Sequence, residues 1–163
     1  MVETPARSVA DSRATLARLT VPSDANVMGS VFGGVILDEV DRTAYITAAR
    51  HCHRNCVTAS FDRVDFHAPV HLGELLTFQS ELTYVGRSSM EIWVRVHAED
   101  LMSGDTRMVG SAFVTMVAVD KSGRPIEVPP LALKTAPERA RFAAGKARME
   151  ARRRSRLAES RSG

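Results

Sequence analysis

Four long segments in which apolar and polar residues alternate follow one another between residues 57 and 120. The pattern is clearest in Ser88–Ala98, where apolar side chains occupy every even position from 90 to 96. A period of two predicts half-buried β-strands, here Val57–Phe66, Leu75–Val85, Ser88–Ala98 and Thr106–Asp120. Because short, turn-forming connections join them, the strands should pair antiparallel in one sheet.

A single helical pattern precedes these strands. Apolar residues at i, i+3 and i+4 predict a helix over Gly34–Arg50, and a first strand is expected over Thr15–Val21. The predicted apolar face of the helix consists of Leu37, Val40, Ala44, Tyr45 and Ala48. One helix against a large antiparallel sheet is an α+β arrangement. Since the helix is rich in small residues, the simplest packing wraps the sheet around it.

The length of the chain, 163 residues of which 44% are hydrophobic, suits one compact domain. We expect a flexible N-terminus over 1–13, the domain over 14–130 and a basic C-terminal helix or tail over 131–163, helical from Pro137 to Ser160. No stretch approaches the ~20 apolar residues of a membrane span, and residues 1–19 lack the apolar core of a secretory signal. The sequence therefore predicts a cytoplasmic protein with no membrane partner.

The net charge of +3 comes from the C-terminal tail. Residues 137–163 hold nine basic and three acidic residues, so the rest of the chain is slightly negative. Arg152, Arg153 and Arg154 form a modest patch without the aromatic residues that single-strand binders interleave for stacking. Nucleic acid is therefore not an expected partner.

A short segment, His51-Cys52-His53-Arg54-Asn55-Cys56, contains both cysteines of the chain. Two cysteines are too few for a disulfide framework. Structural zinc usually takes ligands from two separate segments, and this cluster has no second group downstream. We expect neither a metal nor a cofactor, and interpret the segment as a polar helix end that runs into a loop.

Asp41 is an acid on the predicted apolar face of the helix, between Leu37 and Tyr45 at about 100° per residue. An unpaired buried carboxylate is costly unless its pKa shifts until it is neutral. The position therefore favours a functional carboxylate at the floor of a cleft, acting as a general base or as a nucleophile. The alternative is an Asp at the edge of the face that reaches solvent or a neighbouring donor.

The Gly33-Gly34 pair opens the same helix. Its free backbone N–H groups and the positive end of the helix dipole could stabilise a developing oxyanion. The pair would serve equally well as a hinge between helix and loop. Asn26, in the preceding loop, could orient a water molecule or donate to a carbonyl, or it could simply brace the loop through an Asx-turn.

Several separate motifs in the right order resemble one known family over about residues 15–130. They are the segment Pro22–Gly34 followed by Asp41, then Val57-Thr58, Asp65–Val70, Gly73-Glu74, Val85–Ser89 and Val117–Pro125. Together these resemble the hotdog-fold acyl-CoA thioesterases, in the branch of the cytosolic acyl-CoA hydrolases and their bacterial relatives.

The resemblance implies a central helix enclosed by a curved antiparallel sheet, with a C-terminal helix added. Two subunits would pair their sheets edge to edge, with the active site at the dimer interface, and three dimers commonly form a hexamer. Asp41 would be the catalytic carboxylate and Asn26 its partner across the interface, with oxyanion donors near Gly33 and Gly34.

Coenzyme A is expected near the turn Arg87-Ser88-Ser89, with Thr58 as a further substrate-binding residue. A guanidinium and hydroxyl groups suit phosphate oxygens, although an ordinary hairpin turn with a solvated Arg would have the same sequence.

The expected reaction is hydrolysis of acyl-CoA to a fatty acid and CoA. A hydratase of the same fold is disfavoured because such enzymes pair an acid with a His, and the helix has no His before His51. A non-catalytic protein that binds acyl-CoA as a sensor is the main alternative.

Overall fold

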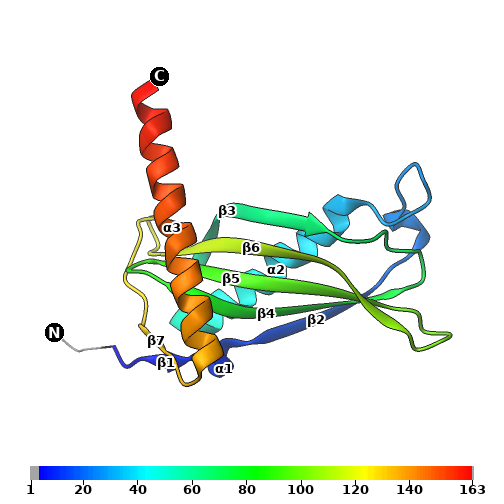
Figure 1. Cartoon of the computed structure of the whole chain (residues 1–163), viewed down its shortest axis with the longest axis horizontal. Helices are drawn as coiled ribbons and strands as arrows, with labels where there is room; N and C mark the ends of the chain where they lie inside the picture. The colour runs from blue at the N-terminus through cyan, green and yellow to red at the C-terminus, as the bar shows by residue number, and fades with distance from the viewer. Residues whose placement is uncertain (1–3, 163) are drawn as a thin grey trace.

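A five-stranded antiparallel sheet curves around one long helix in the computed structural model, which describes residues 4–162 (Figure 1). The strands are β2 (Ala14–Leu19), β3 (Asn55–Phe66), β4 (Leu75–Val85), β5 (Ser89–Glu99) and β6 (Thr106–Val119), and the central helix is α2 (Gly33–Cys52). Their order across the sheet is β2-β4-β5-β6-β3. The α+β class and the expected strands are confirmed, with ends that agree to within about three residues.

Helix α2 packs against all five strands of this sheet. Its buried residues are Ile36, Val40, Thr43, Ala44, Thr47, Ala48, His51 and Cys52. The predicted apolar face is therefore partly wrong, because Leu37 is only half-buried and Tyr45 is 43% exposed. The sheet contacts a face centred closer to Thr43 and Thr47, whose hydroxyls bond to the Glu39 carbonyl and to Ser80, each at 2.6 Å. Because their hydroxyl groups form hydrogen bonds, these threonines can be buried in the core without an unpaired polar atom.

The N-terminal segment differs from the flexible stretch that the sequence predicts. Within residues 4–13, strand β1 (Arg7–Ser8) and helix α1 (Val9–Ser12) are ordered against the body, and β1 pairs in parallel with β7 (Leu131–Ala132). The Arg7 guanidinium donates to the carbonyl oxygen of His51 at 2.8 Å, and Val9 is buried. These contacts are long-range, so local sequence patterns do not reveal them. Residues 1–3 lie outside the described residues.

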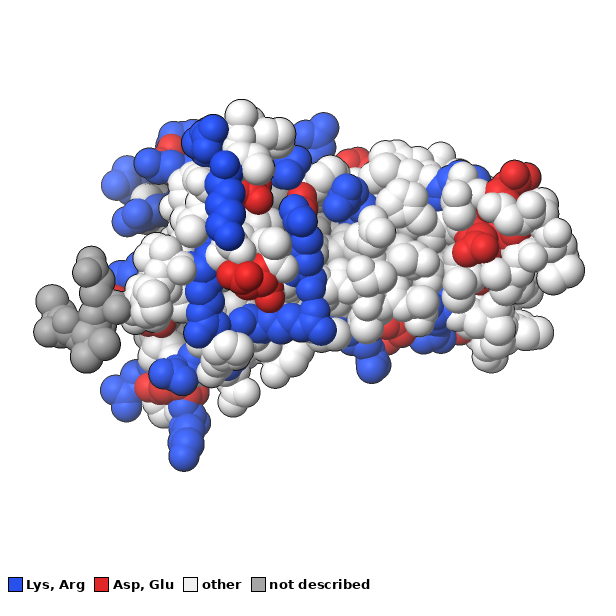
Figure 2. Space-filling model, turned by 90° about the horizontal axis from the view of Figure 1, so that it is seen from below, with Lys and Arg blue, Asp and Glu red and all other residues white. Residues whose placement is uncertain are grey.

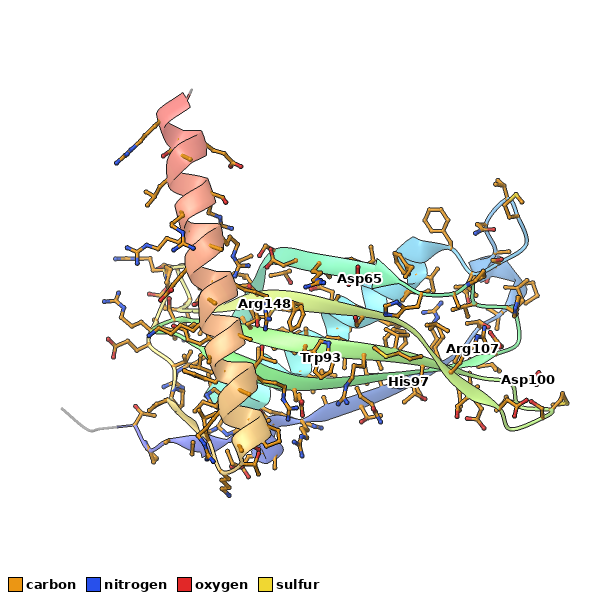
Figure 3. The ribbon with its side chains drawn as sticks, viewed as in Figure 1. Asp65, Trp93, His97, Asp100, Arg107 and Arg148 are labelled. Carbon is orange, nitrogen blue, oxygen red and sulfur yellow. The ribbon has the colours of Figure 1, made fainter. Side chains whose placement is uncertain are left out.

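The C-terminal helix α3 (Ala136–Ser162) crosses the outer face of the sheet and continues beyond its edge (Figure 1). Arginines attach it to the sheet together with apolar contacts, such as the one between the rings of Phe142 and Tyr84, whose centroids lie 4.9 Å apart. Arg148 reaches the sheet (Figure 3), where it bonds to the fully buried Glu91 at 2.8 Å and lies over the ring of Phe113 at 3.9 Å. Gly145 permits this close approach, because an added Cβ would lie 2.8 Å from Cβ of Tyr84.

Candidate functional site

Asp41 lies in the middle of α2, at the edge of the face that the sheet covers. Its side chain is half-buried, so the expectation that it sits within the fully buried face is wrong for the isolated subunit. It matches the alternative of an Asp at the edge of the face, bonded to a neighbouring donor.

That donor is Thr58 on β3. Its Oγ1 donates to Oδ1 of Asp41 at 2.6 Å. Within residues 4–162 no cationic side chain pairs with Asp41, because the adjacent Arg42 pairs with Asp38 at 3.2 Å instead. One carboxylate oxygen is therefore oriented by a hydroxyl, while the other is free to accept a proton.

An open pocket of about 640 Å³ surrounds this pair. Tyr45 and Ile46 from the helix and Cys56 from β3 supply apolar walls beside Asp41 and Thr58. An acid on the wall of a partly apolar pocket is the arrangement expected of a proton acceptor that works on a bound substrate.

The N-terminus of α2 forms a second group of functional atoms. Phe32 precedes the helix without a capping side chain, and among the described residues the amides of Gly33 and Gly34 donate to no protein acceptor. A Cβ at Gly34 would lie 2.8 Å from the ring of Phe32, so a larger residue there would have to displace that exposed ring. The two N–H groups are available to an anion or a carbonyl oxygen.

Asn26 belongs to this second group. Its Oδ1 accepts hydrogen bonds from the amides of Met28 at 2.8 Å and Ser30 at 3.1 Å, so the expected loop-bracing role is present. Its side-chain NH2 donates to no acceptor in residues 4–162. Asn26 and Gly33 line the same pocket of about 430 Å³, between the loop and the segment after β3.

The two groups do not meet within one subunit. Asp41 follows Gly33 by eight residues, which corresponds to about 12 Å along a helix. A reacting carbonyl must lie within about 3 Å of both its base-activated water and its oxyanion donors. One chain therefore holds two separate groups of candidate residues, one with Asp41 and Thr58 and one with Asn26 and the helix N-terminus, which we call the two candidate half-sites.

The turn Arg87-Ser88-Ser89 lies apart from both half-sites, between β4 and β5. The amide of Gly86 donates to the carbonyl oxygen of Ser89 at 2.8 Å, which closes the turn. Arg87 is exposed and forms no ion pair among the described residues. Thr58, which we expected among the CoA-binding residues, lies beside Asp41 rather than at this turn. Its even position on β3, in phase with the inward-facing Cys56, is the sequence signal that indicated this side.

The cysteine segment ends α2 and leads into β3, as expected of a polar helix end, but only His53, Arg54 and Asn55 of this segment are exposed. His51, Cys52 and Cys56 are buried, and the two sulfurs lie 3.5 Å apart as free thiols. The hydrogen bond between the thiols lowers the pKa of Cys52 to about 7. Among residues 4–162 no group of three or more His, Cys, Asp or Glu side chains could hold a metal ion.

A central helix enclosed by a curved antiparallel sheet, with a carboxylate in mid-helix and free amides at its N-terminus, defines the hotdog class of thioester-processing proteins. The family model of the thioesterase superfamily matches residues 28–104. An acyl-CoA thioester hydrolase of Bacillus subtilis named YkhA, itself uncharacterised, is 40% identical over 129 residues, which are 78% of this chain and 75% of that protein. The chain therefore belongs to the thioesterase superfamily, in its acyl-CoA thioester hydrolase branch.

Further relatives support this assignment. The cytosolic acyl coenzyme A thioester hydrolase of the rat is 38% identical over 86% of this chain, which spans only 38% of the rat protein. A hexameric acyl-CoA thioesterase superposes with a TM-score of 0.87 at 38% identity, over 93% of this chain and 97% of that one. The acyl-CoA hydrolase of Staphylococcus aureus, solved with butyryl-CoA and CoA, superposes with a TM-score of 0.87 at 30% identity. The superposition covers 97% of this chain and 96% of that one. The likeness to both structures extends into α3. Within the described residues no helix is long and apolar enough to cross a membrane.

Proposed function

We propose that the protein hydrolyses acyl-CoA to a free carboxylic acid and CoA, in an active site completed by two subunits. The observation that carries this proposal is the division of the site. Asp41 with Thr58 and Asn26 with the α2 N-terminus are two helical turns apart in one chain, so a partner must bring them together.

The S. aureus hydrolase supports the choice of residues. Alanine variants of an aspartate, an asparagine and a threonine of that enzyme have been crystallised. Their positions along its chain are separated by the same intervals as Asn26, Asp41 and Thr58 are here. We therefore assign these three residues to the reaction, with Thr58 orienting the carboxylate of Asp41.

The free edge of β3 is the surface that we propose for pairing. Within the described part of the chain β3 pairs only with β6. Val57, Phe61 and Phe66 on this strand are 50%, 39% and 52% exposed. A long, apolar, unpaired edge tends to bind another strand. Two copies joined there form the proposed dimer, and three dimers form the proposed hexamer, as in the hexameric relative.

The proposed chemistry balances without a cofactor. Asp41 takes a proton from water, and the resulting hydroxide oxygen bonds to the thioester carbon while the carbonyl oxygen becomes an oxyanion beside the amides of Gly33 and Gly34 of the partner. When the oxyanion collapses, the carbon–sulfur bond breaks and the CoA thiolate takes the proton from Asp41. Direct attack by Asp41 would instead form a mixed anhydride that water then cleaves. Label found in Asp41 after a single turnover in ¹⁸O-labelled water would identify the anhydride route with water attack at the Asp41 carbon, because the general-base route places the label only in the product acid.

Replacement of Asp41 by Asn tests the assignment. Loss of the base should lower kcat for acyl-CoA hydrolysis by about 10²- to 10⁴-fold, with the circular dichroism spectrum unchanged. The matched control is Asp38→Asn, one turn earlier on α2, where the exposed carboxylate only pairs with Arg42. Hydrolysis at the wild-type rate by Asp41→Asn would refute the role of Asp41. A wild-type protein that binds acyl-CoA without releasing thiol would instead be a sensor.

The compartment is a separate proposal. We propose that the protein acts in the cytoplasm, as the name of the rat relative states for that protein. Fractionation of cells that express the protein tests this location. No partner beyond acyl-CoA and further copies of the same chain is proposed.

A further inference from the structure

A pocket on the outer face of the sheet joins α3 to the turn between β4 and β5. It has a volume of about 480 Å³ and lies on the opposite face from α2. Its basic residues include Arg87 from the turn and Arg153 and Arg156 from α3, and Ser89 adds a hydroxyl. Neither half-site described above shares a residue with this pocket.

Some arginines near this pocket form ion pairs with acids of the sheet, and others do not. Arg141, Arg148 and Arg152 pair with the sheet acids Glu81, Glu91 and Asp62, and these ion pairs attach the helix. Arg153, Arg156 and Arg87 form no ion pair within residues 4–162. Lys and Arg side chains gather on the half of the molecule that carries α3 (Figure 2).

The pocket concentrates this unpaired positive charge on one side of the helix. Arg153 and Arg156 line it, as do Met149 and Leu157, whereas Arg154 and Arg161 do not. Glu150 is the one acid among its lining residues. Two unpaired arginines of the helix therefore border the same pocket as the unpaired arginine of the turn. Converging guanidinium groups are suited to phosphate oxygens.

The rest of the pocket is apolar. Tyr84, Val117, Met149 and Leu157 supply an aromatic ring, aliphatic surface and a thioether. Apolar walls beside phosphate-binding donors fit a flat ring joined to phosphates, and the volume lies within the range of small-molecule sites. The chemistry is that of a phosphorylated nucleotide, such as the group at the end of CoA.

We infer that α3, through Arg153 and Arg156, binds the nucleotide end of the acyl-CoA substrate together with Arg87. This inference rests on the proposed hydrolase function and assigns a role to the basic helix. The helix makes the enzyme selective for CoA esters over thioesters that lack the nucleotide.

Steady-state kinetics of the full-length protein with an acyl-CoA and with the matching acyl-pantetheine test the inference. Each of Arg153→Gln and Arg156→Gln should lower the ratio of kcat/KM for acyl-CoA to that for acyl-pantetheine by about tenfold, which corresponds to one charge-assisted hydrogen bond. The effect should lie in KM for acyl-CoA. Arg154→Gln, which removes the same charge from the same helix outside the pocket, should leave the ratio within about twofold.

Two sets of results would contradict the inference. An unchanged ratio in the Arg153 and Arg156 variants, or an equal fall in Arg154→Gln, would overturn the inference. If added 3′-phosphoadenosine 5′-diphosphate altered acyl-pantetheine hydrolysis while acyl-CoA kinetics ignored both arginines, the pocket would be regulatory and the substrate assignment wrong.

Calorimetric titration with the same nucleotide separates this inference from the proposed function. Binding that Arg153→Gln and Arg156→Gln lose and Arg154→Gln keeps would support the pocket even for a protein that hydrolyses nothing. Hydrolysis of acyl-CoA by a protein that does not bind the nucleotide at these arginines would support the function and refute the pocket.

Discussion

Most polar side chains inside this fold have a hydrogen-bond partner, but His51 is only partly satisfied. It is buried at the end of α2, and its Nε2 lies 2.8 Å from the carbonyl oxygen of Pro129. Its Nδ1 is buried without a hydrogen-bond partner within residues 4–162. Burial lowers the pKa of His51 below its ordinary value of 6.5, although the bond to Pro129 partly opposes the shift. The folded state therefore favours the neutral ring.

Stability should consequently fall as the pH drops below about 6.5, where the unfolded chain binds a proton that the folded chain resists. The midpoint of urea unfolding measured between pH 7.5 and 5.5 should decline for the wild type and decline less steeply for His51→Phe. His53→Asn is the matched control, since His53 is exposed in a left-handed conformation that Asn accepts. A slope that is the same in wild type and His51→Phe would contradict this prediction. Buried acids such as Glu74 act only at lower pH, because Arg107 lowers the pKa of its carboxyl.

At the scale of elements, ionic contacts act together with apolar packing, such as that of Phe142 on Tyr84, to hold α3 on the sheet. Arg148 supplies the central contact, because Glu91 beneath it is fully buried and also accepts a hydrogen bond from Thr83 at 2.7 Å. Removal of one partner from such a pair leaves a buried charge without compensation, which costs more than the net gain from the intact pair. The position of α3 on the sheet therefore depends on an arginine of the helix that lies opposite an acid of β5, far away in the sequence.

Arg148→Met should lower the free energy of unfolding by about 3 kcal/mol. Arg139→Met, at an exposed position that forms no ion pair within residues 4–162, should change it by less than about 0.5 kcal/mol. The double variant Arg148→Met with Glu91→Leu should recover most of the loss, because no charge then remains buried. Urea unfolding at one fixed protein concentration provides the comparison, since association also contributes to stability. Equal and small effects of the two single variants would show that the ion pair is dispensable.

At the scale of the whole molecule, the proposed active site depends on association. A single subunit separates Asp41 from the helix N-terminus by two turns, and it leaves β3 unpaired along one edge. A second copy of the chain bound at that edge would pair β3 and would also bring the two groups of residues together. Activity and oligomeric state should therefore be lost together.

Val57→Asp places a charge on the exposed apolar edge of β3. We expect the protein to sediment as a monomer and to lose acyl-CoA hydrolysis, because the half-sites separate, while circular dichroism stays unchanged. Thr15→Asp places the same charge on β2, at the opposite edge of the sheet, and should remain assembled and active. A fully active monomeric Val57→Asp would refute the shared site.

Much of the architecture could be predicted from local patterns. The alternation in the four long strands and the helical period around Asp41 depend only on neighbours in the sequence, and the strand bounds, α2 and the class of fold were correct. Asp41 itself stood out as an acid among apolar residues. The prediction of its burial was wrong because the helix presents Thr43 and Thr47 to the sheet. The sequence pattern alone does not distinguish a buried threonine with a hydrogen-bonded hydroxyl from a threonine that faces solvent.

Local periodicity thus identified the elements and the acid that belongs to the site, since both follow from the spacing of residues along one segment. Tertiary structure decided which face of α2 is covered and that Thr58 meets Asp41 while Asn26 lies elsewhere. It also decided that three arginines of α3 pair with acids of the sheet and that two others line a pocket with Arg87. Each of these depends on contacts between segments far apart in the chain, which form only when the sheet closes around the helix.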